Sequence, residues 1–120
     1  MRSMPGNNLI VLKSATGDSI RCRVSDTFWS RFLGLMGKPG LPEGEGLLIR
    51  PCNSIHMFFM RFSIDVLFLD RDYTIVKLIR NLKPGSVVGS VPGACQVLEL
   101  AAGTVPESFT NNTRLVSTNV

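Results

Sequence analysis

Two carboxylates stand inside apolar, strand-like runs of this sequence, and they are the first candidates for chemistry. Asp65 lies within Ile64–Leu69 and Glu99 within Cys95–Ala101. Because burying an unpaired charge is costly, each should be paired, hydrogen-bonded or placed at the rim of a cavity. If the two face each other, they form an acid/base pair with separated pKa values. If an arginine lies between them, they belong to a structural ion-pair network.

Three further residues complete the candidate site. His56 is the only histidine, and it could be a general base or simply a hydrogen-bonded residue at the start of a strand. Arg61 stands at a suspected turn, where its planar guanidinium could bind an anionic ligand or join a structural network. Arg31 lies in a predicted helix, from which we expect it to reach a strand carboxylate such as Asp65. The tentative ligand-binding set is Arg61, Asp65, His56, Glu99 and Arg31.

The sequence predicts no metal and no cofactor. The chain has 3 cysteines, which are far apart and form no CxxC pair, so they indicate free thiols in a reducing compartment. The Pro/Gly loop 38–46 lacks a phosphate-cradling pattern, and 81–93 does not lead from a strand into a helix. No catalytic motif of a familiar enzyme class is present, and the sequence alone does not decide whether the protein is an enzyme.

Short apolar runs separated by Gly, Pro and acidic turns predict a strand-rich chain. Leu9–Lys13 and Ile20–Val24 form an expected hairpin around the turn at residues 16–18. Residues 55–60 and 64–69 are expected to be two strands that break near Arg61–Ser63. The apolar residues on both parities of this stretch indicate that both faces are covered or that the phase breaks midway. The remaining predicted strands are 47–49, 74–79, 95–101 and 114–117, whereas 81–92 is predicted to be a loop.

One helix is predicted, between Ser25 or Asp26 and Gly37. Phe28, Phe32, Leu35 and Met36 fall on one helical face, and Gly37 provides a C-terminal stop. Together these elements predict one α+β domain over residues 1–120, with residues 1–8 as a disordered tail. The expected architecture is mostly β: a compact antiparallel barrel-like or sandwich-like domain of about seven short strands with one capping helix.

Charge and hydropathy limit the partners. The net charge is +4, but the 13 Lys and Arg are scattered, so we do not expect nucleic-acid binding. No segment is long enough to span a membrane, and the first eight residues do not form a signal peptide. We expect a cytoplasmic monomer, or an extracytoplasmic protein if an export segment is missing, with an unknown small polar ligand or a protein as partner.

Several short motifs, taken in order, resemble the small prokaryotic family called domain of unknown function 192. The motifs are Arg31-x-x-Gly34-Leu35-Met36-Gly37, Leu41-Pro42, Gly46-Leu47-Leu48, Phe59-Met60-Arg61, Ile64-Asp65-Val66-Leu67-Phe68-Leu69-Asp70, and Val97-Leu98-Glu99-Leu100 with Gly103. The resemblance covers Val24 to Leu115 and implies a small strand-rich α+β domain with no established activity. The chain departs from the family pattern at Phe59, where Trp is common, at Phe62-Ser63, where Asn-Thr is common, and at Asn112-Thr113, where Gly-Asp is common.

These observations lead to three hypotheses. The first is a non-enzymatic ligand-binding or accessory module with its site near Arg61, His56 and Asp65. The second is a small hydrolase or isomerase that uses the pair Asp65 and Glu99 with His56. The third is a protein-interaction domain that exposes apolar residues of the central strands, such as Phe59 and Met57, although the methionines and phenylalanines of this stretch are otherwise expected in the core.

Overall fold

A computed structural model of the chain describes residues 8–25, 44–57 and 60–119, and nine β-strands account for the regular structure within these ranges. Their bounds are β1 (Asn8–Lys13), β2 (Ser19–Ser25), β3 (Glu45–Ile49), β4 (Ile55–His56), β5 (Ile64–Leu69), β6 (Ile75–Leu82), β7 (Val87–Val88), β8 (Gln96–Ala101) and β9 (Val116–Asn119). The fold is therefore mostly β, as predicted.

Seven of the strands form one sheet in the order β6-β5-β8-β3-β2-β1-β9. Neighbours in this sheet are antiparallel except β2 and β3, which run parallel. A parallel pair needs a crossover connection of about a dozen residues or more. Residues 26–43 supply that connection, and the predicted helix falls within them, outside the described residues. Strands β4 and β7 form a separate two-stranded ribbon.

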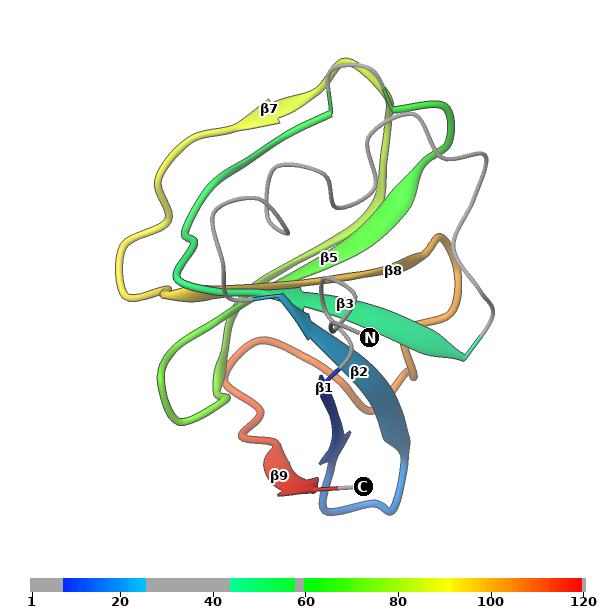
Figure 1. Cartoon of the computed structure of the whole chain (residues 1–120), viewed down its shortest axis with the longest axis vertical. Coiled ribbons are helices and arrows are strands. Elements are labelled where there is room, and N and C mark those ends of the chain that lie inside the picture. The colour runs from blue at the N-terminus through cyan, green and yellow to red at the C-terminus, as the bar shows by residue number, and fades with distance from the viewer. Residues whose placement is uncertain (1–7, 26–43, 58–59, 120) are drawn as a thin grey trace, which may run out of the picture.

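The large sheet curls into a half-barrel (Figure 1). Its two end strands are linked by a short ladder centred on the bridge between Thr74 and Arg114. The Ile75 amide donates to the Thr113 carbonyl at 2.8 Å, and the Leu115 amide donates to the Tyr73 carbonyl at 3.0 Å. This ladder brings the start of β6 next to the segment that leads into β9.

Apolar side chains form one core on each face of the sheet. The first core cluster fills the inside of the curl, where the loop residues Val105, Phe109 and Leu115 close it. The second core cluster lies on the other face and includes Met57 and Val91 from outside the sheet. Every residue of β5 is buried. The apolar residues on both parities of this strand thus reflect burial on both faces, one of the two readings that the sequence left open.

The hairpin of β1 and β2 agrees with its sequence pattern. Ile20, Cys22 and Val24 are buried, whereas Arg21 is exposed, so period-two alternation places one face of the strand in the core. Gly17 closes the turn with φ of +98°, a conformation that residues with a Cβ rarely adopt. Its amide donates to the Ser14 carbonyl at 3.0 Å.

Some boundaries differ from the predictions. The strand expected over residues 55–60 is reduced to β4 (Ile55–His56), and Val87–Val88, predicted to be loop, pairs with it as β7. The terminal strand begins at Val116 rather than Arg114, and Asn8, predicted to lie in a disordered tail, is the first residue of β1. Two-residue strands are shorter than any period that sequence can show. No helix in the described part of the chain is long and apolar enough to cross a membrane.

Candidate anion-binding groove at the Tyr73 turn

Asp65 is held by backbone amides. Its side chain is fully buried. Oδ1 accepts a hydrogen bond from the Asn81 amide at 2.8 Å, and Oδ2 accepts from the amides of Gly103 and Val105 at 2.9 and 3.4 Å. Several N–H donors can stabilise a buried carboxylate without a cationic partner. The structural role that the sequence left open for Asp65 is thus filled by main-chain groups, not by an arginine of the described residues.

A bulge in β6 explains why a backbone amide is available to Asp65. Ile64 pairs with Leu82 and Val66 with Ile79, so β6 holds one extra residue opposite Asp65. Asn81 takes φ of +58° at this point. A bulge leaves a backbone group without its ladder partner, and the Asp65 carboxylate accepts from the Asn81 amide there. Asp65 therefore ties β6 to the loop that follows β8.

Glu99 lies on the opposite face of the sheet from Asp65. In the β5–β8 register, Asp65 pairs with Leu100 and Val66 pairs with Glu99. Because successive side chains point to opposite faces, the two carboxyl groups project to different sides. They cannot form the acid/base pair considered from the sequence, and the hydrolase or isomerase hypothesis loses its basis.

Burial alone sets the protonation state of Glu99. The residue is 6% exposed, and desolvation raises the pKa of its carboxyl to about 8. Among the described residues, no hydrogen bond or ion pair to this carboxyl is present. Glu99 is thus mainly a neutral carboxylic acid at pH 7.

Two of the other predicted site residues, His56 and Arg61, do not join these carboxylates. His56 is exposed in β4, opposite Val87, and Arg61 is exposed before β5. Arg31 lies outside the described residues. Met57, which the sequence offered as part of an exposed apolar groove, is fully buried in the second core cluster. The sequence left two places open for Met57, the core or an exposed groove, and its burial in this cluster confirms the core; Phe59 lies outside the described residues.

A different set of polar residues gathers at the turn between β5 and β6. Asp70 Oδ1 accepts from the amides of Asp72 and Thr74 at 2.8 and 2.9 Å, which fixes a tight three-residue loop. Tyr73 ends this loop with φ of +65°. Three-residue hairpin loops commonly place a left-handed residue there, and glycine is the usual choice. A tyrosine in this position costs about 1–3 kcal/mol and points to a use for its side chain.

The Tyr73 hydroxyl is part of a network that joins three elements. The Arg50 Nη1 donates to the Tyr73 hydroxyl at 3.1 Å and to Gln96 Oε1 at 3.3 Å. The Gln96 Nε2 in turn donates to the Asp70 carbonyl at 2.9 Å, and Gln96 is only 4% exposed. The network fixes Arg50, just after β3, against the start of β8 and the β5–β6 turn.

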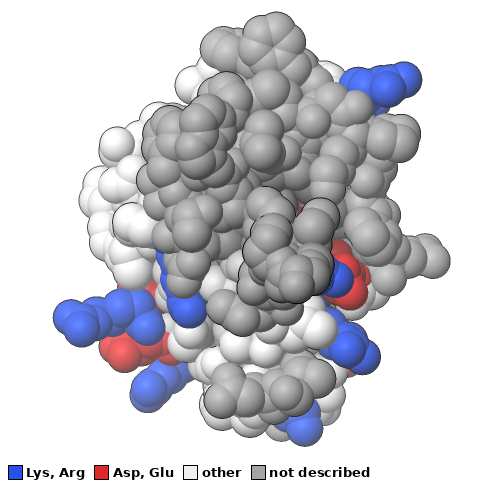
Figure 2. Space-filling model, viewed as in Figure 1, with Lys and Arg blue, Asp and Glu red and all other residues white. Residues whose placement is uncertain are grey.

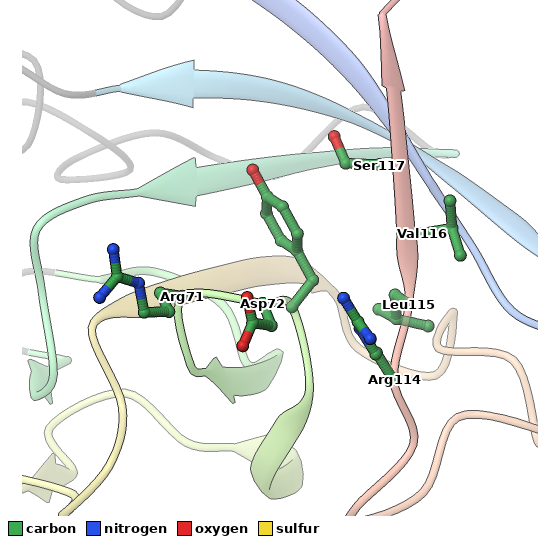
Figure 3. Close-up of a pocket in the computed structure, with 7 residues that line it drawn as sticks. Arg71, Asp72, Arg114, Leu115, Val116 and Ser117 are labelled. Atoms are coloured by element: carbon green, nitrogen blue, oxygen red, sulfur yellow. The ribbon is translucent and has the colours of Figure 1, made fainter.

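Two hollows flank Tyr73, and together we call them the Tyr73 groove. The Arg50 hollow, of about 360 Å³, is lined by Arg50, Pro51, Arg71, Tyr73, Cys95 and Gln96. The Arg114 hollow, of about 340 Å³, is lined by Arg71, Asp72, Tyr73, Arg114, Leu115, Val116 and Ser117. Figure 3 shows Arg71 and Arg114 on either side of Asp72, with Val116 on the strand at the edge of the hollow.

The groove carries more positive than negative charge. Arg50 and Arg71 line the Arg50 hollow, and none of the described residues that line it is acidic. The hydrogen-bond partners of Arg50 are neutral. Within the described ranges, the one ion pair joins Arg23 and Glu45 at 3.4 Å, far along the sheet from this turn. Guanidinium groups without acidic partners favour carboxylate or phosphate ligands.

The sequence did not predict this groove. Acidic turns were expected between strands, but Tyr73, Arg50 and Gln96 were not among the candidate site residues. The available signal was a bulky aromatic residue closing a short Asp-containing loop, where Gly or Asn is expected.

The cysteines do not form a metal site with other residues: no group of three potential ligands gathers in the described part of the chain. Burial raises the pKa of the Cys22 thiol to about 12, so this thiol is unreactive at neutral pH.

Two solved structures share the fold. A crystal structure from Sinorhizobium meliloti 1021, described as a "putative transcription regulator", superposes with a TM-score of 0.80 at 24% identity and covers 97% of this chain and 98% of that one. A protein of unknown function from Novosphingobium aromaticivorans superposes with a TM-score of 0.75 at 17% identity and covers 90% of this chain and 83% of that one. At these identities the likeness shows the fold alone.

Two archaeal proteins are similar in sequence. A UPF0127 protein from Thermococcus sibiricus is 37% identical over 89 residues, which are 71% of this chain and 57% of that protein. The UPF0127 protein PH1112 from Pyrococcus horikoshii is 43% identical over 67 residues, 52% of this chain and 56% of that protein. The matched part thus spans little more than half the length of these relatives. The model of the family DUF192, "Uncharacterized ACR", matches residues 10–115, and the chain belongs to this family.

Proposed function

We propose that this protein is a non-enzymatic ligand-binding module that takes a small anionic molecule into the Arg50 hollow. The observation that carries the proposal is Arg50 itself, a half-buried guanidinium whose hydrogen bonds go only to neutral groups. A partly desolvated arginine gains most from an anionic partner. The site lies at the β5–β6 turn, not beside Arg61 and His56, where the sequence had suggested it.

The geometry favours a carboxylate or phosphate ligand. Tyr73 and Gln96 both accept from Nη1 of Arg50, which fixes the plane of the guanidinium and leaves its other N–H groups for a ligand. Arg71 adds a second cation from the turn. A planar fork of this kind matches the two oxygens of a carboxylate or phosphate. A volume of about 360 Å³ is at the small end of ligand pockets, which fits a small metabolite.

Nucleic-acid binding has less support. The S. meliloti structure that shares this fold is described as a "putative transcription regulator". Figure 2 shows the Lys and Arg side chains of the described residues in separate groups around the margin of the face in view. A nucleic-acid footprint is a continuous basic stripe or patch. Two guanidinium groups in a small hollow suit a compact anion better.

The experiment is a thermal-melting and calorimetric titration of the protein with citrate, succinate, acetate, inorganic phosphate and sugar phosphates at low salt. A ligand at about 100 times its Kd should stabilise the fold by ~2.7 kcal/mol, a shift of several degrees. Arg50→Gln and Arg71→Gln should remove this shift. Arg21→Gln, an exposed arginine of β2, is the matched control and should retain it.

Arg61→Gln separates the two site assignments. If a ligand is found and Arg61→Gln abolishes its binding while Arg50→Gln does not, the site lies where the sequence suggested and the proposal for the Arg50 hollow is wrong. If no anion of the panel shifts the melting temperature, the binding function itself is refuted for these ligand classes.

A further inference from the structure

The outer edge of β9 is open within the described part of the chain. β9 pairs with β1 on one side, from Lys13↔Val116 to Ile10↔Asn119. It is the last strand in the order of the sheet. Figure 1 shows β9 at the periphery of the molecule, with β1 beside it. An edge strand presents unpaired backbone groups to which another extended chain can add.

The ladder before β9 shows which backbone groups point outward. The Leu115 amide donates to the Tyr73 carbonyl, away from β1. Because bonding direction alternates along an extended strand, the amide and carbonyl of Ser117 point the same way as those of Leu115. The groups of Val116 and Thr118 point toward β1. The ladder with the segment before β6 ends at Leu115. Ser117 therefore has no strand beside it on this side among the described residues, and it lines the Arg114 hollow.

The surroundings of this edge are basic and partly apolar. Among the described residues that line the hollow, Arg71 and Arg114 are basic and Asp72 alone is acidic. Neither arginine forms an ion pair with any described residue. Val116 is 61% exposed, one of two large apolar side chains in the described ranges that are this accessible. An exposed valine on an open edge strand is an aggregation hazard unless a partner covers it.

We propose that an extended acidic segment of a partner protein adds as a strand to the β9 edge. Its backbone bonds the amide and carbonyl of Ser117, and its carboxylate side chains meet Arg71 and Arg114. The positive charge argues against a second copy of this chain as the occupant. Two copies of this chain, each with a net charge of +4, repel one another, whereas an acidic segment is attracted to Arg71 and Arg114.

Proline substitutions test the backbone contact. Ser117→Pro removes the outward amide without touching the β1 ladder, and proline is tolerated on an edge of this kind. Ser117→Ala keeps the amide and controls for the hydroxyl. Thr118→Pro removes an amide that faces β1, so it should lower the melting temperature, whereas Ser117→Pro should leave it nearly unchanged.

The probe is a fluorescein-labelled peptide of alternating glutamate and valine, titrated with the full chain by anisotropy. We expect Ser117→Pro and Arg114→Gln each to weaken binding at least tenfold, and Ser117→Ala and Arg50→Gln to leave it unchanged. The same peptide with lysine for glutamate, or with alternate backbone amides methylated, should not bind. The methylated peptide keeps the test valid if Ser117→Pro fails to fold.

Three results would overturn the inference. The first is that the acidic peptide does not bind, and the second is that neither Ser117→Pro in the protein nor methylation of the peptide weakens binding relative to the wild-type protein and the unmodified peptide. The third is a dimer, measured by light scattering, that Ser117→Pro converts to a monomer. The Arg50→Gln variant separates this inference from the proposed function. Loss of small-anion binding in Arg50→Gln with intact peptide binding supports both, because the two hollows then act separately.

Discussion

Replacing Glu99 by glutamine should remove a pH dependence that this buried carboxyl imposes on folding. In the folded chain the pKa of Glu99 is raised to about 8 by desolvation, against an ordinary value of 4.5. Below pH 4.5 the carboxyl is protonated in both the folded and the unfolded chain, so it gives the stability no pH dependence there. As the pH rises from 4.5 to 8, the unfolded chain loses the proton while the folded chain keeps it, so the folded state loses stability.

The size of this effect follows from the shift. Each pKa unit corresponds to about 1.4 kcal/mol, so the raised pKa lowers the stability by between about 3 and 6 kcal/mol once the pH exceeds 8. Glutamine has nearly the same shape and carries no charge at any pH. Below pH 4.5 the free energies of unfolding of the Glu99→Gln variant and the wild type should therefore differ by a constant amount. Between pH 4.5 and about pH 8 the variant should become steadily more stable relative to the wild type.

Urea unfolding of both proteins between pH 4 and pH 9, with equal m-values as the condition for comparison, measures this difference. Glu107→Gln is the matched control, because Glu107 is exposed and its replacement should give no such slope. A Glu99→Gln difference that stays flat from pH 4 to pH 9 would refute the reasoning. It would mean that the carboxyl is ionised in the folded chain and held by a compensating group.

Three further predictions concern stability and binding. Asp65→Ala leaves three backbone amides without their acceptor and should cost about 3 kcal/mol or more, measured by urea unfolding; wild-type melting behaviour would contradict it. Gly46→Ala places a methyl group 2.8 and 2.9 Å from two buried leucine side chains and should cost about 1–3 kcal/mol, whereas Gly89→Ala, with no neighbour within 4 Å, should be nearly neutral by the same assay. Tyr73→Phe removes one hydrogen bond, so we expect a loss of about 1 kcal/mol in stability together with weaker anion binding in the calorimetric titration; unchanged anion affinity would show that the hydroxyl does not orient Arg50.

The strands were predictable because their signal is local. In the hairpin of β1 and β2 and in β5, apolar side chains alternate or run together between turn residues, and each strand lies within a few residues of its predicted range. β7 was missed because two apolar residues in a Pro/Gly loop carry no period. Its pairing with β4 depends on a contact between segments about thirty residues apart. The parallel pairing of β2 with β3 is likewise a property of the long connection, which sequence alone does not place.

The site was less predictable because it depends on register. Asp65 stood out as a carboxylate in an apolar strand, and the structure explains it, but its partners are main-chain amides that have no sequence signature. Glu99 stood out for the same reason. In the register of β5 and β8, however, it pairs with Val66, the neighbour of Asp65, so its side chain points to the other face of the sheet. Arg50 and Gln96 looked like ordinary strand-end residues. They meet Tyr73 only because β3, β8 and the β5–β6 turn end at the same side of the sheet.

Backbone conformation gives an independent reason to place the site at Tyr73. Among the residues that the structure describes, three other than glycine have positive φ: Tyr73, Asn81 and Asn112. Asparagine tolerates this region, and the Asn81 and Asn112 amides donate to Asp65 and to Ile75, so both positions are explained by the fold. Tyrosine does not tolerate it cheaply, and a glycine at residue 73 would form the same loop. What a glycine would lack is the ring, which lines both hollows and packs against the first core cluster, and the hydroxyl that accepts from Arg50. Core packing and the contact with Arg50 offset the strain at Tyr73, and together they hold an ordered aromatic side chain in the groove, which makes the groove the first place to look for a ligand.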